Sequence, residues 1–178
     1  MKKCCVTGHR PQTLNLLMKY QDFNDISFMD YNDAVYVTVL EALKDGFDYF
    51  ISGGAIGVDL DFAEAVIKTK EHKCFTKEKK IEVEIVVPCD NQDLKWRPTD
   101  KERYHSILLE ADKVTLLGGK YTFDCMQKRN EYMVDNSEKV FAFWNGEKKG
   151  GTWNTIQYAK SKSKEVEIID LRKICKGE

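Results

Sequence analysis

Residues 52–59 read Ser52-Gly53-Gly54-Ala55-Ile56-Gly57-Val58-Asp59 and stand between an apolar, strand-like run at Tyr49–Ser52 and a helical pattern at Val58–Lys70. A glycine-rich turn between a strand and a helix is typical of phosphate-binding sites. Glycine lets the backbone approach an anion, and the following helix points unpaired N–H groups and the positive end of its dipole at that anion. The stretch therefore predicts a strand–turn–helix unit that binds a phosphorylated ligand.

The spacing of Gly53, Gly54 and Gly57 matches neither of the two common nucleotide-binding fingerprints. No Lys-Ser or Lys-Thr follows, as a Walker A loop requires, and the order is not G-x-G-x-x-G. We expect Ser52 to offer its hydroxyl to the ligand. For Asp59, in the first helical turn, capping of the helix is the favoured role and a ribose contact the alternative. For the glycines, close helix–strand packing is the alternative to ligand approach.

Strand-like and helical patterns alternate along the whole chain. Five predicted strands are short and buried: Lys3–Thr7, Tyr49–Ser52, Glu82–Val87, Val114–Leu117 and Val140–Trp144. A sixth, Val166–Ile169, lies near the end of the chain. The predicted helices are Asp30–Lys44, Val58–Lys70, Thr99–Glu110, Asp124–Asn136 and Thr152–Ser161. This alternation favours an α/β fold with a mostly parallel central sheet between layers of helices. Two stretches, Pro11–Met29 and Pro88–Pro98, are expected to be long connections.

Composition places the chain among ordinary globular proteins. It has 178 residues, a net charge of −1 and six cysteines without a C-x-x-C pair. We expect one domain over residues 1–178, a cytoplasmic location, reduced thiols and no metal site. No apolar run approaches the roughly 20 residues that span a membrane. The net charge makes nucleic acid an unfavoured partner.

Two more segments follow predicted strands in the same way as residues 52–59. Thr7-Gly8-His9-Arg10-Pro11 comes after the first strand, where Gly8 permits an unusual turn and His9 and Arg10 project from the sheet edge. Arginine there can form paired hydrogen bonds with a phosphate or carboxylate. Gly150-Gly151-Thr152 is a second glycine turn, with Thr152 placed as a helix N-cap or a phosphate ligand. For Thr7–Pro11, the alternative interpretation is a plain turn with a solvated arginine.

Two other residues are ambiguous from spacing alone. Arg129 lies in the middle of a predicted helix, where a solvated face is the common outcome. Trp96, beside Arg97 in the Pro88–Pro98 loop, either stacks on a base or packs under its own loop.

Taken together, these motifs resemble the YpsA-like family of the SLOG superfamily. The resemblance spans about residues 3–170 and rests on Thr7–Pro11, Ser52–Asp59, Pro88 with Gln92 and Trp96, Met126-x-x-Arg129-Asn130-x-Tyr132-Met133-Val134-Asp135, and Trp144-Asn145-Gly146 with Gly150–Thr152. It implies a Rossmann-like three-layer fold. It also implies a ligand of nucleotide type, such as ADP-ribose, NAD or a nucleoside phosphate, at the carboxyl ends of the strands. On this basis Arg129 is expected to contact the ligand.

More distant SLOG relatives include the LOG phosphoribohydrolases and the single-stranded DNA binder DprA. The LOG enzymes cleave an N-glycosidic bond with an arginine, which Arg129 matches, and with a glutamate, where this chain has Thr155. Threonine cannot replace a carboxylate in that chemistry.

Three functions follow, in order of preference. The first is a nucleotide-binding sensor or regulatory module, as a homo-oligomer or with a protein partner. The second is an N-glycosidic-bond hydrolase or transferase that uses Asp59, Asp124 or Glu131 instead of the missing glutamate. The third is a DprA-like binder of single-stranded DNA.

Overall fold

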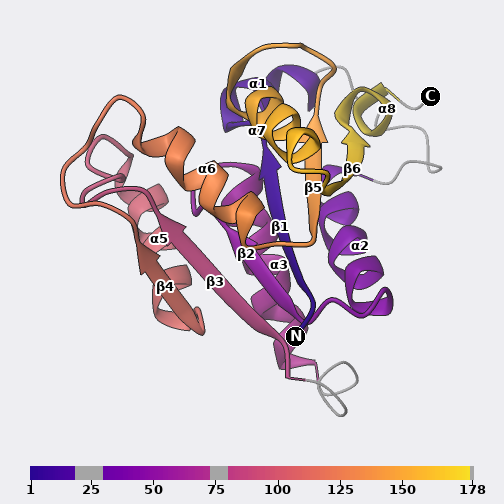
Figure 1. The fold of residues 1–178 in the computed structure, drawn as a ribbon, viewed down its shortest axis with the longest axis horizontal. Coiled ribbons are helices and arrows are strands. Elements are labelled where there is room, and N and C mark those ends of the chain that lie inside the picture. The colour runs from indigo at the N-terminus through magenta and orange to yellow at the C-terminus, as the bar shows by residue number, and fades with distance from the viewer. Residues whose placement is uncertain (19–29, 73–79, 177–178) are drawn as a thin grey trace.

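The computed structural model describes residues 1–18, 30–72 and 80–176. Six strands form one sheet in the order β4-β3-β2-β1-β5-β6, and every pair of neighbours is parallel (Figure 1). The strands are β1 (Lys3–Gly8), β2 (Tyr49–Ser52), β3 (Glu82–Val87), β4 (Lys113–Leu116), β5 (Lys139–Trp144) and β6 (Glu165–Asp170). All six predicted strands are confirmed, and the Rossmann-like α/β arrangement is confirmed with them.

The helices alternate with the strands as predicted. They are α1 (Pro11–Met18), α2 (Tyr31–Lys44), α3 (Val58–Glu71), α5 (Pro98–Glu110), α6 (Cys125–Asp135), α7 (Gly150–Ser161) and α8 (Leu171–Lys176). Asp30 caps α2 by accepting the N–H of Asp33 at 2.8 Å, and Gly46 adopts φ +89° just after the helix, as a stop signal requires.

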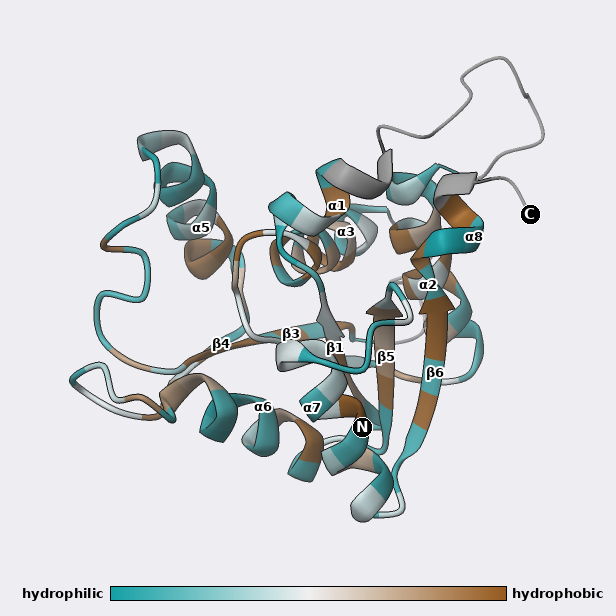
Figure 2. Cartoon of the chain, turned by 90° about the horizontal axis from the view of Figure 1, so that it is seen from above, coloured by the Kyte–Doolittle hydropathy of each residue, from teal (hydrophilic) through white to brown (hydrophobic). Residues whose placement is uncertain are grey.

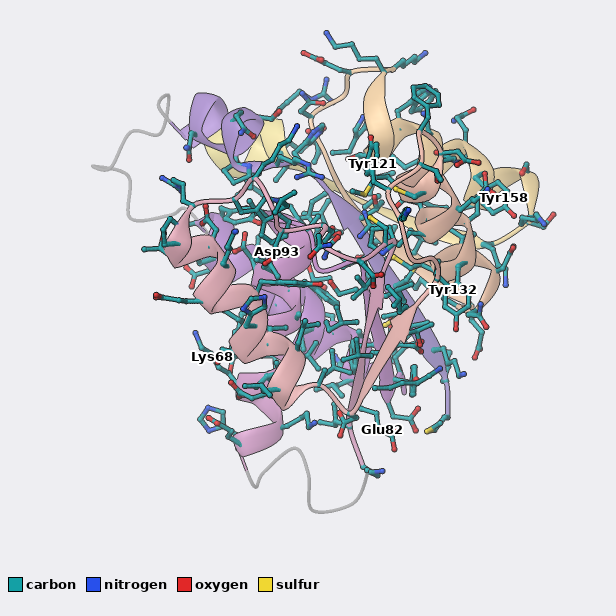
Figure 3. All side chains as sticks on the ribbon, turned by 90° about the vertical axis from the view of Figure 1, so that its left-hand side faces the viewer. Lys68, Glu82, Asp93, Tyr121, Tyr132 and Tyr158 are labelled. Atoms are coloured by element: carbon teal, nitrogen blue, oxygen red, sulfur yellow. The ribbon has the colours of Figure 1, made fainter. Side chains whose placement is uncertain are left out.

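Helices cover both faces of the sheet, so the molecule has three layers (Figure 2). The larger core joins one face of the sheet to α2, α3 and α5, and the smaller core joins the other face to α6 and α7. Figure 3 shows Tyr132 and Tyr158 on the side of α6 and α7, and Lys68 on the opposite side. The central strands β1, β2 and β3 are buried because each has a neighbour on both edges and a helical layer over both faces.

Four expectations about local structure were wrong. Residues 11–18, predicted as irregular, form α1, and residues 19–29 of the predicted Pro11–Met29 connection lie outside the described residues. Strand β4, predicted to be buried, lies at the edge of the sheet with Val114 46% and Leu116 52% exposed, because it has only one neighbouring strand. The helix predicted to begin at Thr99 begins one residue earlier, at Pro98. Thr152 does not cap α7, since the helix begins two residues earlier, at Gly150.

The strand order places a crevice at one point of the sheet. Strand β1 lies between β2, which follows it in sequence, and β5, which comes much later. The connections leaving β1 and β5 therefore diverge to opposite faces of the sheet. In open α/β sheets, ligands bind at the carboxyl ends of the strands at such a switch point.

Candidate functional site

A cavity of about 380 Å³ lies at the carboxyl ends of β1 and β5, at the switch point of the sheet. Its walls come from the β1–α1 segment, the start of α3, the middle of α6 and the start of α7. Seven of the residues predicted for the site line it: Gly8, His9, Arg10, Asp59, Arg129, Gly151 and Thr152. We call it the Arg129 cavity.

The most deeply buried charges in this cavity form an ion pair between two layers of the fold. Arg129 on α6 is 5% exposed, and its Nη1 lies 3.2 Å from Oδ2 of Asp59 on α3. Arg129 also donates from Nε to Oδ1 of Asn130 at 2.8 Å. Burial raises the pKa of Asp59, although the guanidinium of Arg129 acts in the opposite direction. Arg129 therefore lies on a buried face, and its partner comes from a motif 70 positions earlier in the chain.

Asp59 does not cap α3. The N-cap position is Gly57, which has no side chain to offer, and Asp59 lies inside the first turn of the helix. Its Oδ2 accepts the N–H of Ala55 at 3.4 Å while also facing Arg129. The carboxylate thus connects the glycine turn to α6 instead of completing the helix end.

The turn at residues 53–57 is used mainly for contacts within the protein. A Cβ on Gly53 would overlap Nη1 of Arg129, so glycine is what leaves room for the buried guanidinium. A Cβ on Gly57 would lie 2.5 Å from the carbonyl oxygen of His9, and the residue has φ +101°. Two N–H groups of the turn and two at the start of α3 have protein acceptors: Gly54 to Ser52 Oγ, Ala55 to Asp59 Oδ2, Val58 to His9 O and Leu60 to Ala55 O. The alternative of close packing is what the geometry favours for these glycines.

Ser52 and Gly54 lie beneath the cavity wall. Ser52 is fully buried, and its hydroxyl donates to the carbonyl oxygen of Asp59 at 2.6 Å. Gly54 has φ +61°, and a Cβ there would meet Ile85 at 2.8 Å. Both residues shape the start of α3, and neither lines the Arg129 cavity.

The start of α7 is the open helix end at this site. Lys149, the N-cap residue, makes no side-chain hydrogen bond to the helix, and Gly151 and Thr152 line the cavity. The first N–H groups of an α-helix have no acceptor within the helix, so they are available to an anion. A Cβ on Gly151 would meet only Asn130 Nδ2, at 4.0 Å, and one on Gly150 (φ +81°) would meet nothing within 4 Å.

Arg10 adds a second cation to the cavity. It is exposed, immediately precedes α1, and its carbonyl oxygen accepts the N–H groups of Thr13 and Leu14. The cavity thus contains two guanidinium groups, one carboxylate and one helix N-terminus. This set carries an excess of positive charge and suits an anionic ligand.

His9 lies at the mouth of the cavity as a neutral imidazole. Its Nε2 accepts the backbone N–H of Asn145 at 3.2 Å, which ties the end of β5 to the end of β1. Burial lowers the pKa of His9 from its ordinary value of 6.5. At neutral pH the side chain is therefore a positioning group and adds no charge to the cavity.

This geometry predicts a pH dependence of stability. Because the pKa of His9 is lower in the folded chain, the unfolded chain binds the proton more tightly. The contribution of His9 to the free energy of unfolding is complete above about pH 6.5 and declines below it, by at most about 1.4 kcal/mol per pH unit. In urea unfolding at pH 7.5, 6.0 and 5.0, the free energy of unfolding should fall more steeply with decreasing pH for the wild type than for His9→Gln. Parallel curves would contradict the assignment.

Trp96 lies in a neighbouring cavity. Its ring packs edge-on against Tyr104, with centroids 5.2 Å apart, and its other surface lines a cavity of about 420 Å³. Arg10 and Ile56 line both cavities. The ring therefore packs under its own loop and also faces a cavity, in which stacking on a base stays a prediction. We call this space the Trp96 cavity.

Of the three carboxylates considered for catalysis, Asp59 alone lines the Arg129 cavity. Asp124 is paired with Lys128 at 2.7 Å, and Glu131 accepts from Gln127 at 2.9 Å. Thr155, at the position where the LOG motif has its glutamate, is buried and donates to the carbonyl oxygen of Gly151 at 2.9 Å.

The described residues contain no cluster of His, Cys, Asp and Glu side chains that could hold a metal ion. Within the same ranges, no helix is both long and apolar enough to cross a bilayer. Cys89 and Cys125 are buried, with their sulfur atoms 4.0 Å apart.

Six lining residues were not among the predicted site residues: Thr7, Thr13, Ala55, Ile56, Met126 and Asn130. Thr7 at the end of β1, Thr13 on α1 and Met126 on α6 all face the Arg129 cavity. Thr13 was missed because its segment was interpreted as irregular, although Pro11 is a typical first residue of a helix. Met126 belongs to the family motif on α6, but no spacing rule marks it as a lining residue.

Comparison with known proteins gives one family. The family model YpsA, described as the YspA SLOG family, matches residues 4–174. The chain is 27% identical to UPF0398 protein BH1768 of Halalkalibacterium halodurans, over 98% of this chain and 88% of that protein. It is 24% identical to UPF0398 protein YpsA of Bacillus subtilis, over 84% of this chain and 79% of that protein. It is 35% identical to the uncharacterized SPbeta prophage-derived protein YoqJ of Bacillus subtilis, over 70% of this chain and 77% of that protein.

Proposed function

The chain belongs to the YpsA SLOG family, and we propose that it binds a nucleotide or nucleotide derivative in the Arg129 cavity. One observation carries the proposal. Arg10, Arg129 and the open start of α7 come from three separate segments and meet in one cavity at the switch point of a parallel sheet. A phosphate is the group that such an arrangement binds best.

The polar groups around the cations fit the rest of such a ligand. A phosphate at the N–H groups of Gly151 and Thr152 would have both guanidinium groups within the same cavity. Hydroxyl and amide side chains on the walls, from Thr7, Thr13 and Asn130, can hydrogen-bond a ribose. ADP-ribose, NAD and nucleoside phosphates share these features. Because Thr155 is at the position of the LOG glutamate, we favour a sensor or regulatory module over a hydrolase.

Gly151→Leu is expected to abolish nucleotide binding without unfolding the protein. The leucine side chain would fill the space in front of the first turn of α7, while its Cβ would approach no neighbouring group more closely than 4.0 Å. Leucine is also a better helix former than glycine. The test is a thermal-shift assay with AMP, ADP, ADP-ribose and NAD. A ligand at about 100 times its dissociation constant should add about 2.7 kcal/mol to the free energy of unfolding of the wild type and nothing to that of the variant.

Asn154→Leu is the matched control, because it adds the same side chain to an exposed position on the same helix away from the cavity. It should respond to nucleotide as the wild type does. The proposed site is wrong if none of the nucleotides raises the melting temperature of the folded wild type. It is also wrong if they raise that of Gly151→Leu by the same amount.

A hydrolase remains the second candidate, on one specific observation. Asp59 lines the cavity, and burial raises its pKa, which is the kind of shift that suits a carboxyl group to acid–base work. The test is release of free base from AMP or NAD. Product formed in proportion to protein and lost in Asp59→Asn would favour this function, whereas binding without product favours the sensor.

A further inference from the structure

The Trp96 cavity adjoins the proposed nucleotide site and is not explained by it. It lies on the far side of Arg10 and Ile56 from α7, and its walls come from α1, the loop before α5 and the first turn of α5. Its volume, about 420 Å³, is similar to that of the Arg129 cavity. Arg10 and Ile56 line both cavities, so the two cavities adjoin and can be treated as the two ends of one site.

The second end has its own positive charge. Arg10, Lys95 and Arg97 line it together with a single carboxylate, that of Asp100. Arg97 uses Nε to bind Asp100 Oδ2 at 3.0 Å, which leaves its terminal N–H groups for another acceptor. Lys95 is exposed and has no ion-pair partner among the residues that the structure describes. On a chain with a net charge of −1, this concentration of cations is local.

Part of the wall of the Trp96 cavity is apolar. Trp96 presents a ring held in place by Tyr104, and Pro11 and Ile56 complete the wall next to it. A flat aromatic group fits such a surface, since stacking on tryptophan does not depend on the identity of the base. The Trp96 cavity thus combines a flat apolar surface with an anion-binding end.

We propose that the two cavities together bind a nucleotide that carries two separated anionic groups. One group lies at the start of α7 with Arg129, the base or ribose lies against Trp96, and the second group lies against Lys95 and Arg97. Arg10 stands between the ends and contributes to both. This inference rests on the proposed function and narrows its ligand class from nucleotides in general to those with a second, separate phosphate or equivalent group.

The test compares three adenosine ligands by isothermal titration: AMP, ADP and adenosine 3′,5′-bisphosphate. ADP adds its charge next to the first phosphate, whereas the bisphosphate adds it on the other side of the ribose. We expect the bisphosphate to bind at least about tenfold more tightly than AMP, as a new hydrogen-bonded charge contact provides. ADP should bind less than about threefold more tightly than AMP, because its extra charge stays at the first end.

The double variant Lys95→Ala/Arg97→Ala locates the second end. In it, the ratio of the AMP and bisphosphate dissociation constants should fall to within about twofold of one. Lys160→Ala, which removes an exposed positive charge from the last turn of α7, is the control and should keep the wild-type ratio.

The outcomes separate this inference from the function on which it rests. If none of the three ligands binds to the folded wild type, the proposed function fails and the inference fails with it. Three results would overturn only the two-ended ligand, provided that AMP binds. The bisphosphate could bind no more tightly than AMP, ADP could bind as tightly as the bisphosphate, or the double variant could keep the higher affinity for the bisphosphate.

Discussion

Arg129→Met is expected to lower the free energy of unfolding by about 3–5 kcal/mol, the usual cost of removing one partner of a buried ion pair. Arg129 and Asp59 are 5% and 7% exposed, so the variant leaves the largely buried carboxylate of Asp59 without its ionic partner. The pKa of Asp59 is already raised by burial, and it should rise further without Arg129. The folded variant then takes up a proton more readily, and its deficit relative to the wild type should shrink as the pH falls.

Urea unfolding of wild type and variant at pH 7 and pH 5 measures both effects. Lys128→Met is the matched control, because the neighbouring Lys128 is exposed and its pair with Asp124 should contribute less than about 1 kcal/mol. Adding Asp59→Asn to Arg129→Met should recover part of the stability, since no unpaired charge then remains. Equal losses for Arg129→Met and Lys128→Met would show that the pair has no special role.

Gly53→Ala is expected to destabilise the fold by about 1–3 kcal/mol and to abolish the nucleotide response. The new methyl group would overlap Nη1 of Arg129 and lie 2.6 Å from Asp59 Oδ2, so the buried pair must separate to admit it. The sequence alone predicts that a bulky residue at Gly53 blocks a ligand and leaves the fold intact. The geometry changes that expectation, because the space beside Gly53 is filled by the protein itself.

Gly119→Ala controls for the general cost of replacing a glycine. A Cβ there meets only Asp90 Oδ2, at 3.6 Å, which is an ordinary contact. This variant should unfold at nearly the wild-type urea concentration. If Gly53→Ala does so too, the close approach of Arg129 to residue 53 is wrong.

The fold followed from local patterns, because each element carried its own signal. The run at Tyr49–Ser52, the glycines after it and the helical spacing from Val58 are contiguous in sequence, and a parallel sheet is the natural way to combine such units. Helix α1 was missed because its eight residues provide barely two turns of periodicity. The exposure of β4 was missed because a strand's hydrophobicity does not reveal whether it lies at the centre or the edge of the sheet.

The site was harder to predict from the sequence than the fold, because it depends on contacts that local patterns do not show. The glycine turn at residues 53–57 and the turn at Gly150–Thr152 look alike in sequence, and only the structure shows that N–H groups in and just after the first turn bond to Ser52 Oγ, Asp59 and His9. The spacing of Arg129 favoured a solvated position on its helix. Only the resemblance to a family predicted that its side chain contacts a ligand. The contacts of Val58 with His9 and of Arg129 with Asp59 join segments tens of residues apart, which no local pattern encodes.

The ion pair between Asp59 and Arg129 has a mechanical consequence. Asp59 belongs to the helical layer of α3 and Arg129 to that of α6, so their contact passes around the end of the sheet and connects layers that the strands otherwise keep apart. The pair therefore joins the two helical layers at the switch point of the sheet. An anion bound in the cavity would therefore lie beside the one point at which these two charged groups join the layers.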